Sequence, residues 1–592
     1  MNKIKRNTFL KMGALTMLAP FADSLFLTAM PVKQSGATGD DEALLKKLLA
    51  ANDQQVEQLL KVPVTGLVFS RRTGSDIAVL SAAYCSAGSK FYHEGPVIQK
   101  FDELLRLLVN AQSEDGTVDI GNLESPPDTA FLLELLCAAA SILEKDHSPA
   151  LQHINQLLKN FIVKSGEALA KGGVHTPNHR WVVCAALAHI NSLYPNKSYI
   201  NRIAEWLGEG IFIDADGHYP ERSRTYDYVE NNSLIAMARL LNKPELLNAV
   251  RKNLSMSWYY IEPNGDMVTT DSRRQDQWIG RDKLGYYLHY RYMAIRDNNA
   301  AFAGIATVME TLPGFQEEVL SRSLFRCLEN PVLLKMLPVA TMPPVNYEKL
   351  FTTSALLRIR RQDAATTVFG GADWPIIIAS GRSNSPNFYA YRKGQAILKY
   401  MRLSTNFFST GYFYSDGIRK EGDHYILHKT LDVPYYQPLP KNLRNSKGDY
   451  KLSPSIDGRF WNKMDFGNRP TSNIKKLDTT ITFRETAAGN ELIFDITGQS
   501  GVAVTIELCF ATGGKLSGVS QTANGDYLLE NGMGQYEAGG DTIRFGPGTV
   551  AHKTIRNLEG ERYSTHFGTL RTEGMHVYLT GVTPFKHTLT FG

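Results

Sequence analysis

The stretch that decides the fold of the first half of the chain is DGHYPERSRTYDYVENNSLIAMARLL, residues 216–241. It begins with a turn, and its second half carries apolar residues every three or four positions, which is the spacing of an amphipathic helix. Turn glycines recur at intervals of about 50 residues, the length of one helical hairpin with its loops. We therefore predict an array of αα-hairpins from about residue 42 to 335, with turns at Gly66, Gly116, Gly172 or Gly173, Gly217 and Gly265.

The character of the sequence changes after about residue 350, where short alternating or β-branched runs replace the helical pattern. Runs such as 356–360, 492–496 and 503–508 are separated by clusters of Gly, Asn, Asp and Pro, which is typical of antiparallel strands. The pattern of the second half therefore predicts stacked antiparallel sheets that form a β-sandwich. The segment 430–475 is rich in Pro, Asn and Lys, and we expect a long loop between the sheets there.

The N-terminus has the pattern of a secretory signal. Lys3, Lys5 and Arg6 precede an apolar run over positions 9–30, and small residues follow it. We therefore predict that residues 1–37 direct export to the periplasm or the extracellular space. No other uncharged apolar run reaches the ~20 residues that a bilayer requires, so the sequence predicts no integral membrane span in the mature chain.

Length, charge and cysteine content exclude several classes of protein. A chain of 592 residues is too long for one compact core, so we expect more than one domain. The net charge of +5 comes without the basic stripe that nucleic-acid binding requires, so no nucleic-acid partner is predicted. The 5 scattered cysteines contain no CxxC pair, which signals neither a zinc site nor a disulfide framework.

The segment Thr176-Pro177-Asn178-His179-Arg180-Trp181 combines several groups that can bind an anion. Thr176 is suited to cap a helix and Pro177 to start it, which places the next three residues in the first turn. Free N–H groups and the positive end of the helix dipole favour an anion there, and they should lower the pKa of His179. The segment therefore predicts a site for a carboxylate, built from Asn178, His179 and Arg180.

A second helix start, at 222–228, supplies phenols beside guanidinium groups. Tyr226 is the preferred catalytic tyrosine, and Tyr228 is its alternative. A phenol titrates near ~10, so its anion needs the stabilisation that Arg222 and Arg224 could provide. The remaining candidates for substrate binding are Arg273 and Arg274 after the turn at Gly265, Asp128 as an N-cap or sugar contact in the turn 125–129, and His424 and Tyr436 in the second half.

Amide, imidazole, guanidinium and phenol groups suit the cleavage of a glycosidic bond next to a uronic acid by β-elimination. The C5 hydrogen of a uronic acid is barely acidic while the neighbouring carboxylate stays ionised. An enzyme must therefore neutralise the carboxylate with hydrogen-bond donors, remove the C5 proton with a base and protonate the departing O4. The two helix starts together contain all of these groups.

A helical-hairpin domain followed by a β-sandwich on an exported chain resembles the toroid-plus-sandwich polysaccharide lyases. These include the heparinase II/III-like, alginate-lyase and hyaluronate/chondroitin AC lyase families. The pair Asn178-His179 resembles the pair that such lyases place at a helix start, and 216–228 is similar to their Asp-Gly turn followed by the catalytic tyrosine. The resemblance implies an (α/α) toroid over residues 38–342 and an antiparallel β-sandwich over residues 343–592.

The resemblance also implies roles for the candidate residues. Asn178 and His179, with either Arg180 or Arg224, would neutralise the carboxylate. Tyr226 and His179 would share the proton transfer. The partner would be an acidic polysaccharide or oligosaccharide, and no cofactor is implied, with a divalent metal as the open alternative.

The sandwich departs from the heparinase-like pattern in one segment. Members often carry a His-x-His motif leading into an Asn-Ser-Phe-like strand, but Arg382-Ser383-Asn384-Ser385-Pro386-Asn387-Phe388-Tyr389 contains no histidine. This removes the usual grounds for a structural zinc. The stretch 411–440 is instead loosely similar to the sandwich signature of hyaluronate and chondroitin lyases, which implies that His424 or Tyr436 could overhang the cleft.

Two other functions fit the same sequence. A toroid glycoside hydrolase of the inverting type would need two carboxylates ~6.5–9.5 Å apart, and Asp128, Glu221, Asp227 and Glu230 are available. A non-catalytic glycan-binding protein would use the same cleft. For a lyase, the substrate could be a glycosaminoglycan, alginate or the glucuronate caps of plant arabinogalactan, and the missing histidine motif favours a rhamnose–glucuronate lyase.

Overall fold

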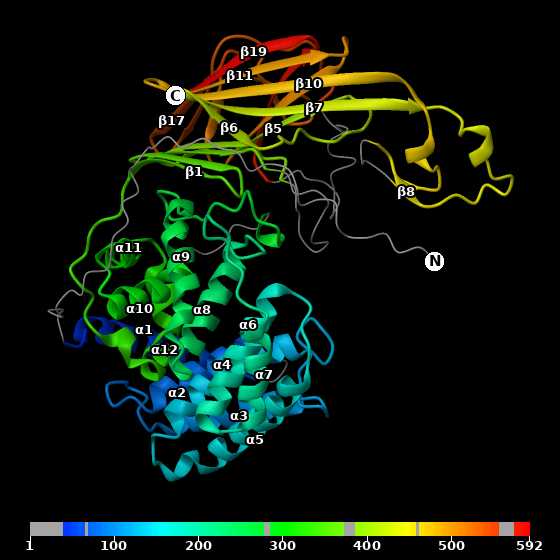
Figure 1. Ribbon diagram of the computed structural model, residues 1–592. Coiled ribbons are helices and arrows are strands. Elements are labelled where there is room, and N and C mark those ends of the chain that lie inside the picture. Colours follow the sequence, from blue (N-terminus) through cyan, green and yellow to red (C-terminus); the bar gives the residue numbers. More distant parts are fainter. Residues whose placement is uncertain (1–38, 65–68, 278–283, 372–384, 457–460, 556–572) are drawn as a thin grey trace, which may run out of the picture. The chain divides into compact units, whose positions relative to one another are not determined.

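The computed structural model describes residues 39–64, 69–277, 284–371, 385–456, 461–555 and 573–592 (Figure 1). The predicted export segment 1–37 lies outside these ranges, and so does the Arg382-Ser383-Asn384 part of the motif that lacks a histidine. The described residues form a helical part followed by a β-sandwich. The predicted fold class is therefore confirmed.

The first half of the chain consists of helices that bury apolar faces, as the hairpin pattern predicts. Most of them start after a Ser, Thr, Asp or Asn residue in the N-cap position. They are α1 Glu42–Lys61, α2 Arg71–Tyr84, α3 Gly95–Asn110, α4 Pro126–Leu143, α5 Gln152–Lys171, α6 Pro177–Leu193, α7 Lys197–Gly208, α8 Arg224–Leu240, α9 Leu247–Ser257, α10 Tyr287–Asp297, α11 Ala300–Glu310 and α12 Leu324–Glu329.

Helices α2, α4, α6 and α8 form an inner layer, in which each packs against the next. Helices α4 and α6 are buried on nearly all sides, whereas α7 buries only Tyr199 and Ile203. A helix that is buried all round belongs to the interior, and a helix with one buried face belongs to the outside. This alternation is the predicted (α/α) toroid. Among the described helices, α4 alone has the length and apolar composition of a membrane span, and 72% of that span is buried inside the protein.

Glycine turns join the outer helices to the inner ones. Gly116, Gly217 and Gly265 have φ angles of +96°, +108° and +87°, which residues with a Cβ atom rarely adopt. These three predicted turns are confirmed. Gly172 instead ends α5 with extended backbone, and Gly66 lies outside the described residues.

The inner helices begin at a common edge of the helical part, because alternate helices of a hairpin array run in the same direction. Their N-cap residues are Ser70, Ser125, Thr176 and Ser223. We use the term rim for this edge, defined as residues 70–71, 122–131, 175–180, 216–228 and 271–277. The rim contains most of the residues that the sequence predicts to be functional.

The described residues of the second half form two large sheets, which lie one above the other in Figure 1, and one small sheet of two strands. In the described residues one sheet has the order β1-β2-β3-β4-β5-β12-β18-β15-β14 and the other the order β13-β16-β17-β19-β11-β10-β7-β6. Neighbouring strands are antiparallel except β15 and β18. The strands are β1 Asn346–Phe351, β2 Leu356–Arg361, β3 Ala364–Phe369, β4 Tyr389–Lys393, β5 Ala396–Thr405, β6 Ile418–Glu421, β7 His424–Tyr436, β10 Thr471–Thr486, β11 Gly489–Gly498, β12 Ala503–Phe510, β13 Lys515–Ser517, β14 Ser520–Gln521, β15 Tyr527–Leu528, β16 Gly534–Ala538, β17 Asp541–Gly546, β18 Met575–Val582 and β19 Phe585–Phe591.

Alternating strands place their apolar residues between the two sheets. In β11, Leu492, Phe494 and Ile496 are buried in this core, as the alternation of the sequence predicts. The predicted long loop is also present, but it is shorter than 430–475. It covers residues 437–470, with β8 Ser453–Pro454 and β9 Trp461–Asn462 inside it, because β7 and β10 extend further than the sequence pattern indicates (Figure 1).

Strand β2 connects the sandwich to the helical part. Arg358, which is completely buried, donates hydrogen bonds of 3.1 and 2.9 Å to the two carboxylate oxygens of Glu262, which follows α9. Phe351 and Leu356 of the first two strands belong to the apolar core of the helices. The two folds therefore share an apolar and ionic contact next to the turn at Gly265.

Candidate active site

The candidate site is organised by a buried carboxylate, Glu221, which the sequence indicated only as a possible hydrolase residue. Glu221 is 0% exposed. Its Oε1 accepts hydrogen bonds from the backbone N–H of Asn178 at 3.2 Å and from the side-chain amide of Asn178 at 2.7 Å. Its Oε2 is paired with Arg274. One carboxylate therefore ties the start of α6 to the turn 271–277.

Arg274 links this carboxylate to the predicted catalytic tyrosine. Its Nη2 donates a hydrogen bond of 3.2 Å to the phenol oxygen of Tyr226, and its guanidinium carbon lies 4.3 Å from the centre of the Tyr226 ring. The N–H of Tyr226 is held by the N-cap residue Ser223 at 3.3 Å. Because Arg274 donates to the phenol oxygen, a phenolate formed there would keep a cationic hydrogen-bond donor.

Asn178 lies beneath the surface of the rim. It is 0% exposed, and its side-chain amide also donates to the hydroxyl of Thr176 at 3.1 Å. Its carbonyl oxygen Oδ1 has no hydrogen-bond partner among the described residues. The sequence predicts that Asn178 contacts a carboxylate directly. In the structure its donors hold Glu221, so it fixes the position of that residue.

His179 is present as a neutral imidazole. It is 9% exposed, and its ring lies edge-on to His175 at 4.7 Å and to Phe131 at 6.1 Å. Burial, followed by the positive charges of neighbouring groups that include Arg274, lowers the pKa of His179 to about 4. The predicted direction is confirmed, but burial is the main cause. At neutral pH the ring can therefore accept or donate one hydrogen bond without carrying a charge.

Asp128 does not cap α4, because Ser125 does so and accepts a hydrogen bond of 3.2 Å from the N–H of Asp128. The carboxylate of Asp128 is 3% exposed and accepts hydrogen bonds from Arg71 and from Asn122, the latter at 2.8 Å. Burial raises the pKa of Asp128, but the hydrogen bonds from Asn122 and Arg71 outweigh it and hold the pKa below its usual range. Asp128 is therefore an ionised anchor for Arg71.

Arg71 is a rim residue that sequence reasoning missed. It is the first residue of α2, and its guanidinium carbon lies 4.0 Å from the centre of the Phe131 ring. The sequence does contain a signal for it: Ser70 is an N-cap residue directly before Arg71 and an apolar helical run. Ser223 precedes Arg224 in the same way at the start of α8.

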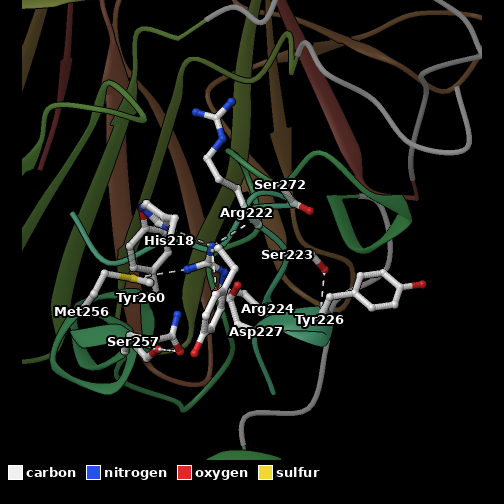
Figure 2. A network of polar contacts seen from close by, with 12 residues as sticks. His218, Arg222, Ser223, Arg224, Tyr226, Asp227, Met256, Ser257, Tyr260 and Ser272 are labelled. Atoms are coloured by element: carbon white, nitrogen blue, oxygen red, sulfur yellow. Dashed lines mark hydrogen bonds and ion pairs between the residues drawn. The ribbon is translucent and has the colours of Figure 1, made fainter. Parts of the chain in front are cut away.

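A second polar network lies under the start of α8, and Arg224 is at its centre. Arg224 is 1% exposed and donates to His218 Nδ1 at 3.1 Å, forms an ion pair of 3.3 Å with Asp227 and lies 4.3 Å from the centre of the Tyr260 ring. Figure 2 shows these groups close together, with the side chain of Tyr226 directed away from them. Arg224 is one of the two arginines, with Arg180, that the resemblance implies for neutralising the substrate carboxylate. In the structure it is buried, and its contacts hold the start of α8.

The other predicted arginines have separate contacts. Arg180 donates a hydrogen bond of 2.8 Å to Glu209, at the end of α7. Arg273 holds the segment before α8 by donating to the carbonyl oxygen of Pro220 at 2.9 Å. Arg222 has a φ angle of +45°, and Figure 2 shows its side chain directed away from the buried network. Arg274, in contrast, contacts both the oxygen and the ring of Tyr226.

The remaining three predicted residues, Tyr228, His424 and Tyr436, have contacts of their own. The ring of Tyr228 packs 4.9 Å from the ring of His289 in α10. His424 contacts its neighbour Asp423 at 3.2 Å, and the ring of Tyr436 packs against a phenylalanine of the 437–470 loop at 4.7 Å. Neither His424 nor Tyr436 has a contact with the rim among the described residues.

Metal-ligating side chains do not gather in the described part of the chain: no three His, Cys, Asp or Glu residues there could hold one ion. The rim combines amide, imidazole, guanidinium and phenol groups with buried carboxylates, and these groups act by hydrogen bonding and proton transfer.

Comparison with known proteins identifies the fold. No protein-family model and no curated protein matches the sequence. Among solved structures, heparinase III has a TM-score of 0.52 and 11% identity over 88% of this chain and 74% of its own. Chondroitin AC lyase of Streptomyces coelicolor A3 has a TM-score of 0.52 and 12% identity over 92% of this chain and 79% of its own.

Xanthan lyase of Paenibacillus is similar at a TM-score of 0.54 and 10% identity, over 93% of this chain and 57% of its own. The chain therefore has the toroid-plus-sandwich fold of these polysaccharide lyases, as its sequence predicts. Identities this low establish the fold, and the reaction has to be argued from the side chains of the rim.

Proposed function

We propose that this protein is an exported polysaccharide lyase that cleaves a uronic-acid-containing glycan by β-elimination. The observation that carries the proposal is the continuous set of contacts from Asn178 through Glu221 and Arg274 to Tyr226, beside the neutral His179. It lies on the rim of a fold shared with heparinase III and chondroitin AC lyase. Export rests on the signal-like composition of residues 1–37.

Each step of an elimination has a group available on the rim. Tyr226 takes the C5 proton as a phenolate, and the hydrogen bond from Arg274 stabilises the negative charge of that phenolate. The electron pair of the C5–H bond forms the C4–C5 double bond as the C4–O4 bond breaks. The phenol then returns its proton to O4, and His179 donates a hydrogen bond to the carboxylate or shares in the transfer.

Burial argues against the glycoside hydrolase alternative. The four carboxylates that could serve it are 0–3% exposed, and two accessible carboxylates must flank the scissile bond in a hydrolase. They are Asp128 at 3% and Glu221, Asp227 and Glu230 at 0%. Tyr226 is half-buried and its side chain extends from the network beneath it, so the phenol is better placed for the chemistry than any of these carboxylates (Figure 2).

The substrate classes that fit the proposal are glycosaminoglycans, alginate and rhamnose-capped glucuronates of plant arabinogalactan. The test is ultraviolet absorbance during incubation with one glycan of each class, because β-elimination produces a C4–C5 unsaturated uronate. Wild-type protein should produce this absorbance, and Tyr226→Phe should reduce kcat by about 10²-fold or more while glycan binding is kept.

Tyr226→Phe tests the role of the phenol oxygen alone, because it keeps the ring that stacks on Arg274 and removes only that oxygen. Release of sugar without unsaturated product would contradict the lyase and favour a hydrolase. Binding without any product from any of the three classes would favour a glycan-binding protein.

A further inference from the structure

Arg71 adds an exposed cation to the rim on the side of His179 that is away from Tyr226. In the inner layer α6 lies between α4 and α8, so His179 of α6 separates Phe131 of α4 from Tyr226 of α8. The side chain of Arg71 is 46% exposed and stacks on Phe131, whose ring lies 6.1 Å from that of His179. Tyr226, His179 and Arg71 thus follow one another along the rim.

The guanidinium group of Arg71 is held in place by a buried carboxylate and an aromatic ring. One nitrogen pairs with Asp128, which is 3% exposed and fixed in turn by Asn122. The Phe131 ring supports the face of the guanidinium. Among the described residues Asp128 is the only one that accepts a hydrogen bond from Arg71. The remaining N–H groups of a positioned guanidinium are therefore available to a ligand.

Arg71 and Arg274 differ in what they can bind. Arg274 is 6% exposed and is engaged with Glu221 and Tyr226, so it belongs to the chemistry. Both arginines contribute to the lowered pKa of His179. Neighbouring helices pack about 8–10 Å apart, and Phe131 of α4, on which Arg71 stacks, is two helices away from Tyr226 of α8. A group at Arg71 therefore lies on the order of 20 Å from one at Tyr226. A single monosaccharide does not cover that separation.

We propose that Arg71, held by Asp128 and Phe131, is a subsite for a second acidic group on a sugar neighbouring the uronate that is cleaved. The inference rests on the proposed lyase function and narrows its substrate class. Guanidinium groups bind carboxylate and sulfate oxygens through paired N–H donors, and either anion fits an exposed group that offers only donors. The preferred substrate is then a polyuronate or a sulfated uronate glycan, and an isolated glucuronate cap is a poor one.

Binding measurements test the subsite independently of turnover. Full-length Tyr226→Phe is compared with Tyr226→Phe/Arg71→Ala by calorimetry, using oligosaccharides of alginate, chondroitin sulfate, hyaluronan and an arabinogalactan. Loss of one charge-assisted contact should weaken binding of alginate or chondroitin sulfate by roughly ten-fold or more. Arg71→Lys in the same Tyr226→Phe background keeps the charge but loses the paired donors. Its affinity should lie between those of Tyr226→Phe and Tyr226→Phe/Arg71→Ala.

Arg72 provides the matched control. Its side chain is 71% exposed and pairs with Asp76 at 3.8 Å, so Arg72→Ala removes an equal charge one residue away. Arg72→Ala should leave all affinities within about two-fold. If Arg71→Ala weakens the binding of alginate, the group at the subsite is a carboxylate. If it weakens the binding of chondroitin sulfate but not that of hyaluronan, the group is a sulfate.

Several outcomes would overturn the subsite. Equal losses on every glycan, an effect of Arg71→Ala no larger than that of Arg72→Ala, or binding of arabinogalactan alone would each do so. Failure of the lyase proposal looks different, because wild-type protein would then form no unsaturated product while the Arg71 effect on binding persisted. In active protein the substitution should raise KM and leave kcat within about two-fold, because Arg71 does not contact Tyr226.

Discussion

Replacement of Glu221 by glutamine is the most informative perturbation of the site. The amide keeps an oxygen for the two hydrogen bonds from Asn178, but it removes the charge that pairs with Arg274. Arg274 is 6% exposed and would be left as a buried cation without its carboxylate. Breaking a buried ion pair from one side costs about 3–5 kcal/mol, so we expect Glu221→Gln to lower the free energy of unfolding of the helical part by about that amount.

The same substitution should reduce turnover, because Arg274 also donates to the phenol of Tyr226. Denaturant unfolding followed by circular dichroism measures the stability change, and the rate of formation of unsaturated product measures turnover. Glu209→Gln is the control: Glu209 pairs with Arg180 but its side chain is 51% exposed, so the loss should stay below about 1 kcal/mol. If Glu221→Gln were as stable and active as Glu209→Gln, the carboxylate would not organise the site.

Three further substitutions test other parts of the structure. His179 has a folded pKa of about 4 against an ordinary value of 6.5, so the unfolded chain binds more protons between these values. The free energy of unfolding of the wild type should therefore fall by about 3 kcal/mol more than that of His179→Gln as pH drops from 6.5 to 4. Denaturant unfolding of both proteins across this pH range measures the difference. Arg224→Met should lower the free energy of unfolding by about 3 kcal/mol or more, because Asp227 loses its buried partner, whereas Arg180→Met should cost less than about 1 kcal/mol; equal losses would contradict the buried network. Gly217→Ala should cost more than about 1 kcal/mol in denaturant unfolding, because its φ is +108° and a Cβ would lie 2.8 Å from the carbonyl oxygen of Lys252. Gly210→Ala, at a φ of +79° with nothing near the added Cβ, should cost less, and the reverse order would refute the steric argument.

Local patterns were sufficient to predict the architecture of this protein. N-caps and prolines at 125–127 and 176–177 mark where inner helices begin, and alternation in 492–496 marks a strand of the sandwich. These features depend on a few neighbouring residues, so one sequence contains them. The predicted loop 430–475 is too long at both ends, because β7 and β10 carry polar residues there that do not alternate with apolar ones.

The pairing of side chains on the rim could not be predicted in the same way. Glu221 meets partners 43 and 53 positions away, Asn178 and Arg274, and no local pattern specifies such an approach. Arg224 is a cationic residue at a helix start, which is a common place for a ligand-binding residue, yet its side chain is buried beneath that start. Whether an arginine at a helix N-terminus is buried or exposed depends on the packing of neighbouring helices.

The common starting edge of the inner helices has a consequence for how specificity can diverge. Arg71 belongs to the first inner helix and Tyr226 to the fourth, so the proposed glycan subsite and the proposed catalytic tyrosine lie on different hairpins. Substitutions in the first hairpin can change which polymer is preferred without altering the catalytic end. A family built on such an edge can acquire new substrates one hairpin at a time while its reaction stays the same.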